Sequence, residues 1–239
     1  MTVAHAVTDQ GGYQIDADDL DFLKISDAEF ASWASGDAPL RVSHDDYRYL
    51  CKTLFQALEK EGIDDADVRL QGSAARFFSS PLKPMLYSRA ELVREFLSHY
   101  RRMPSDYEAD RMEQHLASRW SAPGPTQRPF DALFVIGAAA EASDLDFQIS
   151  SHAARSMIEA MANDLGLSLT DIHAAHPHYN FFRKELTETK FVHLSLWRTR
   201  AAELIRRPVS IAIFDGDGPP MSSGAVSSHF QSSDWMVEE

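Results

Sequence analysis

The spacing of apolar and polar residues divides the chain into helical and strand-forming segments. Apolar residues three and four apart predict an amphipathic helix over 43–61, with Ser43 as its N-cap and Gly62 as its stop. The same spacing predicts helices over 27–35, 88–102, 105–120, 151–166 and 191–207. Residues 1–25 show no sustained period and are predicted to be weakly structured.

Shorter strand-like segments lie between these helices. Residues 66–73 and the β-branched residues 209–214 are predicted to be short strands, and residues 143–150 alternate cleanly between polar and apolar side chains. Residues 130–137 are also predicted to be a strand, paired with 143–150 as a hairpin. The predicted fold class is therefore α+β, a small mixed β-sheet with helices packed on it and a helical insertion over 81–128.

This pattern predicts three parts of the chain. Residues 1–40 form an acidic N-terminal arm, and residues 41–220 form the α+β domain that contains the helical insertion. Residues 221–239 are polar and Ser-rich and are predicted to be a flexible tail.

The net charge of the chain limits the kinds of molecule that it is expected to bind. The 239 residues include 36 acidic and 23 basic side chains, a formal net charge of −13. Such a chain is not expected to bind extended nucleic acid or an anionic membrane, because that binding rests on basic surface. The acidic excess gathers in 1–40, so this arm is a candidate for binding a protein partner. The segments 81–128 and 183–207 are slightly basic, which leaves room for a small anion such as a nucleotide.

Cysteine use and hydropathy point to a cytoplasmic protein. The single cysteine, Cys51, excludes an intramolecular disulfide framework and is predicted to be a buried small hydrophobe on the 43–61 helix. No run approaches the roughly 18 to 20 apolar residues of a membrane span. The first ten residues lack the basic start and apolar stretch of a signal peptide, so a cytoplasmic location is expected.

Two carboxylates two residues apart are the strongest candidate chemistry. On a strand, Asp144 and Asp146 point to one face while Leu145 and Phe147 point to the other. Two like charges at this spacing repel unless a cation lies between them, and Mg²⁺ prefers such hard oxygen ligands. The turn at Gly72 and Ser73 follows another strand and could offer backbone N–H groups to phosphate. The alternative is a solvated strand face and an ordinary turn.

The order of these elements resembles the core of the DNA-polymerase-β-like nucleotidyltransferase superfamily. The matching segments are LQGSAARFF (70–78) and SDLDFQIS (143–150), which are most similar to the bacterial cyclic-oligonucleotide synthase and oligoadenylate-synthase-like branch. The 70 residues of 74–143 that separate Gly-Ser from the acid pair exceed the family's usual spacing of about 10 to 20, although closing a longer loop costs little.

The resemblance implies a Mg²⁺-dependent nucleotidyltransferase, in which Mn²⁺ could replace Mg²⁺. It implies that Asp144, Asp146 and a third carboxylate hold the metal and are catalytic, and that the Gly-Ser turn contacts the triphosphate of an NTP. For the third carboxylate, Asp215 is favoured and Asp131 is the competitor. The nucleotide-binding candidates are Gly72, Ser73, Arg76 and Lys83. The acceptor hydroxyl is not identified.

Other interpretations stay open. The chain could be a non-catalytic nucleotide-binding or regulatory module of a toxin–antitoxin or defence pair. IAIFDGDGPP (211–220) resembles the nucleophile loop of haloacid-dehalogenase-like phosphatases, but only 22 residues follow Asp217. His173, His176 and His178 could bind a metal, but the favoured interpretation is an exposed polar loop, because the run contains Pro177 and has no cysteine nearby.

Overall fold

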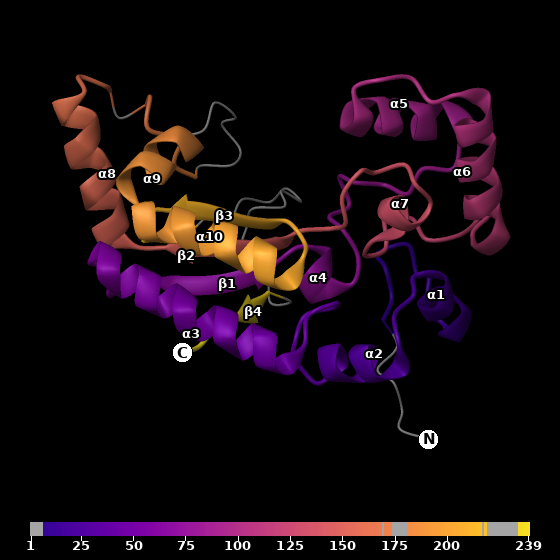
Figure 1. Ribbon diagram of the computed structural model, residues 1–239, viewed down its shortest axis with the longest axis horizontal. Coiled ribbons are helices and arrows are strands. Elements are labelled where there is room, and N and C mark those ends of the chain that lie inside the picture. The colour runs from indigo at the N-terminus through magenta and orange to yellow at the C-terminus, as the bar shows by residue number, and fades with distance from the viewer. Residues whose placement is uncertain (1–6, 169, 174–180, 217, 219–233) are drawn as a thin grey trace. The chain divides into compact units, whose positions relative to one another are not determined.

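The computed structural model describes residues 7–168, 170–173, 181–216, 218 and 234–239. The chain forms two compact units, each built from separate stretches. The first unit comprises Met1–Arg41 and Gly72–Ser143, and the second comprises Val42–Gln71 and Asp144–Glu239. The α+β class is confirmed, because helices accompany a four-stranded mixed sheet (Figure 1).

The sheet belongs to the second unit and has the strand order β3-β2-β1-β4. Its central strand β2 pairs antiparallel with β1 and parallel with β3, while β4 adds to the other edge of β1 in an antiparallel sense. The strands are β1 (Asp67–Gln71), β2 (Leu145–Ser150), β3 (Val209–Phe214) and β4 (Trp235–Met236). The strands predicted over 66–73, 143–150 and 209–214 are therefore confirmed.

Helices α3 (His44–Glu61) and α10 (Val192–Ile205) cover one face of this sheet (Figure 1). The apolar positions of β2 point toward them, and Leu145, Phe147 and Ile149 have no exposed surface. The Phe147 ring meets Trp197 of α10 edge-on, with 5.3 Å between ring centroids. Burying these alternate side chains stabilises the sheet by about 2 kcal/mol for each large apolar residue.

Helix α8 (His152–Asp164) follows β2 directly, and Asp65 fixes its start. The Asp65 carboxylate accepts hydrogen bonds from the Ser151 hydroxyl and from the backbone N–H groups of His152 (2.9 Å) and Ala153 (3.1 Å). Burial opposes ionisation of Asp65, but these hydrogen bonds outweigh it and hold the pKa of the carboxyl below 3.8. The remaining helix of this unit is α9 (Lys184–Lys190), which precedes α10.

The first unit is helical, and its N-terminal residues are part of its interior. Asp19 has a fully buried side chain that accepts hydrogen bonds from Tyr13 (3.0 Å), Trp120 (2.7 Å) and Arg119 (2.6 Å). Arg119 also pairs with Asp16. The helices are α1 (Ala17–Phe22), α2 (Asp27–Ala34), α4 (Ser73–Arg76), α5 (Arg89–Tyr100), α6 (Asp106–Arg119) and α7 (Ala132–Val135).

Several local predictions are confirmed in this unit. Ser88 and Glu91 form the expected capping box at the start of α5, and Ser105 and Glu108 form the one at the start of α6. Helix α2 lies within the predicted 27–35 segment.

Three predictions are wrong for the residues described. Residues 7–25 are not weakly structured, because polar groups such as Asp19 fix them to α6. Residues 130–137 contain the short helix α7 (Ala132–Val135) rather than a strand, since the buried Ala132, Leu133 and Ile136 follow helical spacing. Residues 235–236 of the supposedly flexible tail form β4, whereas 219–233 lie outside the described residues.

No helix among the residues that the structure describes is long and apolar enough to cross a membrane.

The hydrogen bonds that Asp19 accepts predict that the protein loses stability when this side chain is removed. Asp19→Ala removes the carboxylate and leaves the Arg119 charge and the Trp120 N–H without their buried partner, so we expect a loss of about 3–5 kcal/mol in the free energy of unfolding. Urea denaturation followed by circular dichroism measures it. The matched control is Asp18→Ala, which changes an exposed acid in the same first turn and for which we expect a loss below about 1 kcal/mol. Equal losses in both variants would contradict the role given to Asp19.

Candidate functional site

Asp144 and Asp146 converge on one hydroxyl group. Asp146 lies in β2 and Asp144 directly before it, so both side chains point to the face opposite Leu145 and Phe147. The Ser210 hydroxyl of β3 lies 3.0 Å from Asp144 Oδ2 and 2.9 Å from Asp146 Oδ1. The parallel register explains this, because Ser210 stands directly beside Asp146.

The negative charges of the two carboxylates favour the binding of a cation between them. A serine hydroxyl has one proton, so Ser210 donates fully to only one of the two carboxylates at a time. The two carboxylates, which converge on the same hydroxyl, also repel each other. Asp144 is exposed and Asp146 is half-buried, so the pair is open on one side. Two carboxylates and a hydroxyl form a set of hard oxygen donors of the kind that holds Mg²⁺ with water or phosphate.

The same face of the sheet carries further polar side chains from β1. Gln71 stands opposite Asp146 and Arg69 opposite Gln148 in the antiparallel register. The Gln71 amide is buried and donates a 2.8 Å hydrogen bond to Asp234, the residue before β4. Arg69 makes two 2.9 Å hydrogen bonds to Asp67 of its own strand. These bonds hold the side chains beside the acid pair in fixed positions.

Sequence reasoning missed Ser210, Gln71 and Asp234. The alternation of Val209, Ser210 and Ile211 does place Ser210 on the polar face, so its signal was present. The pairing of β3 with β2 in parallel register was needed to bring it to the acids. Asp234 lies in a Ser-rich segment without a strand-like period, and no pattern there marks it.

Asp215 does not join the acid pair. Ser210 pairs with Asp146 at one end of β3, whereas Asp215 follows the other end, about 16 Å along the strand. There its carboxylate pairs with Arg155 of α8 and accepts a 2.6 Å hydrogen bond from the Gly216 N–H. Among the described residues, no group of three or more His, Cys, Asp or Glu side chains is arranged to hold a metal ion.

Asp131 does not supply a third carboxylate beside the pair in a hairpin, because that hairpin does not form. It precedes α7 in the first unit and is 4% exposed. Its carboxylate accepts a 2.8 Å hydrogen bond from the Ser143 N–H, and the Ser143 hydroxyl accepts a 3.0 Å bond from the Asp131 N–H. This reciprocal pair gives Asp131 a structural role.

The predicted nucleotide-binding residues all belong to the first unit. Gly72 follows Gln71 at the end of β1 and has φ 77° and ψ −167°, a conformation that essentially only glycine adopts. Ser73 and Arg76 begin and end α4, and both are half-buried. Lys83 is exposed in a turn closed by a 2.8 Å hydrogen bond from its N–H to the Ser80 carbonyl.

The remaining candidates do not form a second centre among the described residues. Cys51 is buried, and burial raises the pKa of its thiol to about 11, as expected for a packing residue. The His173 ring stacks on Phe182, with 5.3 Å between centroids. His176, His178 and Asp217 lie outside the described residues.

No protein-family model matches this chain, and no curated protein or solved structure matches it. The function is therefore argued from the acid pair and its surroundings.

The geometry of the acid pair predicts an unusual stability effect. In buffer that contains EDTA, Asp144→Ala should leave the free energy of unfolding unchanged or slightly higher, because it removes an exposed like charge beside Asp146 and exposes no core. Asp215→Ala is the matched control on the next strand. It loses the Arg155 ion pair and should cost about 1 kcal/mol. Urea titration of both variants measures the difference, and a clear loss of stability in Asp144→Ala would contradict net repulsion between the two carboxylates.

Proposed function

We propose that the protein is a Mg²⁺-dependent nucleotidyltransferase that transfers a nucleotidyl group from an NTP to a hydroxyl acceptor. The observation that carries this proposal is the convergence of Asp144 and Asp146 on the Ser210 hydroxyl at 3.0 and 2.9 Å. The order of elements around them, α3, β1, the Gly-Ser turn, β2, α8 and β3, resembles the polymerase-β-like core and supports the same function.

The donor set fits a hard divalent ion. Asp144 and Asp146 would bind Mg²⁺ through one oxygen each, and Ser210 supplies a neutral oxygen between them. When bound, Mg²⁺ or Mn²⁺ supplies charge neutralisation for the phosphate oxygens and eases ionisation of the acceptor hydroxyl.

The two carboxylates differ in their surroundings. Asp146 is half-buried within β2, so the strand fixes its direction. Asp144 is exposed and can turn toward a substrate. The assignment of Gly72, Ser73, Arg76 and Lys83 to the phosphates remains a prediction from the sequence.

A second candidate function is a non-catalytic nucleotide-binding or regulatory module. The observation that favours it is Ser210, because the resemblance implies a third carboxylate on a strand beside the acid pair, and β3 presents a hydroxyl at that register. Two carboxylates suffice to bind one metal ion. Nucleotidyl transfer in the family that the chain resembles uses two metal ions.

Metal binding can be tested separately from turnover. Millimolar Mg²⁺ should raise the melting temperature of the wild-type protein, because a ligand that binds only the folded state stabilises it. Asp144→Asn and Asp146→Asn should lose this shift. Asp215→Asn, which alters a carboxylate at the opposite end of β3, should keep it. Loss of the shift in Asp215→Asn alone would place the metal elsewhere.

Turnover is tested by incubation with each labelled NTP and Mg²⁺ or Mn²⁺, with products identified by mass spectrometry. We expect Asp144→Asn and Asp146→Asn to reduce transfer at least about 100-fold, since each removes a charge that the reaction needs. The control Asp64→Asn changes an exposed acid in the loop before β1 and should retain full activity.

The outcomes separate the two candidate functions. Metal-dependent NTP binding without pyrophosphate release would favour the non-catalytic module. Transfer activity that survives in both acid-pair variants would overturn the proposed site, and the absence of NTP binding would overturn both candidates.

A further inference from the structure

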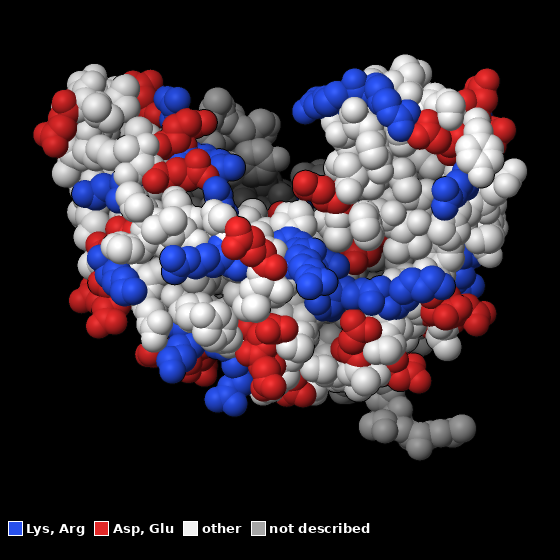
Figure 2. Space-filling view, viewed as in Figure 1, with Lys and Arg blue, Asp and Glu red and all other residues white. Residues whose placement is uncertain are grey.

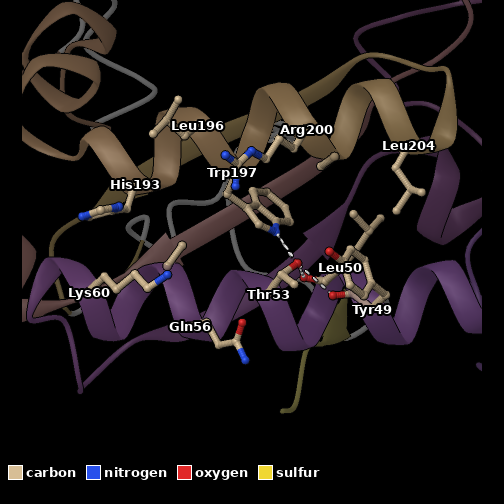
Figure 3. Close-up of a pocket in the computed structure, with 12 residues that line it drawn as sticks. Tyr49, Leu50, Thr53, Gln56, Lys60, His193, Leu196, Trp197, Arg200 and Leu204 are labelled. Atoms are coloured by element: carbon tan, nitrogen blue, oxygen red, sulfur yellow. Dashed lines mark hydrogen bonds between the residues drawn. The ribbon is translucent and has the colours of Figure 1, made fainter.

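A groove of about 220 Å³ lies between α3 and α10 in the second unit (Figure 3). The two helices run in opposite directions along it. Lys60 at the end of α3 and His193 at the start of α10 lie at one end, and Tyr49 and Leu204 lie at the other (Figure 3). Lys60 and His193 thus make one end of the groove basic and Tyr49 and Leu204 make the other end apolar, while Arg200 lies between the two ends beside Trp197 (Figure 3).

The floor of the groove is formed by a tryptophan held in place by hydrogen bonds and by two alanines. Trp197 lies at its centre, and its indole N–H donates to the Leu50 carbonyl (3.2 Å) and the Thr53 hydroxyl (3.0 Å). Ala57 and Ala201 are buried and have no side chain beyond Cβ, so the helices leave space above them. The indole is only 6% exposed, so it fixes the floor of the groove, and the apolar surface open to a ligand comes mainly from the rim.

Three basic side chains line this groove without a partner among the described residues. Lys60, His193 and Arg200 make no ion pair or side-chain hydrogen bond with any part of the chain that the structure describes. None of the described residues that line the groove is acidic. The acid at this end, Glu61, accepts a hydrogen bond from the His193 backbone N–H.

This concentration of positive charge is local. The chain as a whole carries a net charge of −13, and acidic and basic side chains are interspersed over the outer surfaces of α3 and α10 (Figure 2). Basic groups gathered in a concave site raise the local concentration of anions.

The rim of the groove exposes apolar surface. Tyr49, Leu196 and Leu204 are 59%, 48% and 42% exposed. A ligand in the groove would cover part of this surface and remove it from water. Each such contact adds affinity in proportion to the area that it covers.

We infer that this groove binds a small organic anion with a flat apolar body. Its charged group lies within reach of the Lys60, His193 and Arg200 side chains, and its apolar body points toward Tyr49 and Leu204 at the other end of the groove (Figure 3). The groove is smaller than the roughly 300–1,000 Å³ of pockets for drug-sized ligands, so it suits a single-ring compound such as an aryl phosphate. This site is separate from the acid pair and does not rest on the proposed function.

The test uses phenyl phosphate as the probe and isothermal titration of the full chain as the measurement. We expect saturable 1:1 binding, and weaker binding of inorganic phosphate and of phenol, because each lacks one half of the ligand. The variant Lys60→Gln/Arg200→Gln should weaken phenyl phosphate binding at least about tenfold. Both positions are exposed, so the fold is retained, which the melting temperature verifies.

The matched control removes two positive charges from α3 outside the groove. Arg48→Gln/Lys52→Gln should change phenyl phosphate affinity less than about twofold. Equal weakening in both double variants would show attraction by overall charge and overturn the site. Absence of saturation up to about 10 mM, or inorganic phosphate bound as tightly as phenyl phosphate, would also overturn it.

Discussion

The strict alternation of side chains along β2 is the constraint on which the second unit depends. Leu145, Phe147 and Ile149 are fully buried against the helical layer, so Asp144, Asp146 and Gln148 are forced to the other face. A shift of the strand register by one residue would exchange the two sets and bury both carboxylates among apolar side chains. The energy of the core therefore also fixes the direction of the acid pair.

The strands on either side of β2 then bring polar groups next to the two carboxylates. The parallel partner β3 brings the Ser210 hydroxyl between the carboxylates, and the antiparallel partner β1 brings the Gln71 amide beside them. Neither contact requires a loop to adopt a special conformation, because both follow from strand register. A site built on paired strands is held more precisely than one built on loops.

How far the sequence predicts this molecule depends on the range of the interactions. Helices with N-caps and regular apolar spacing, such as α3 and α5, are predicted well because their signals lie within a few residues. The prediction for residues 130–137 was wrong, because a short apolar run fits a buried strand and a single helical turn equally well. The acid pair was predicted as a pair. Ser210 required a parallel register, and the position of Asp215 at the far end of β3 required the same knowledge.

The alternation of the two units along the chain has a consequence for the order of folding. Gln71 pairs with Asp146 across the whole of residues 72–143, a segment that belongs to the other unit. During synthesis from the N-terminus, the first unit has all its residues once Ser143 has emerged, while β1 still lacks every strand that pairs with it. The edges of β1 then stay open until β2 and finally β4 arrive, and closing such distant pairs is slow. The helical unit is therefore complete first, and the strand that holds the acid pair joins a sheet whose last member comes from the final residues of the chain.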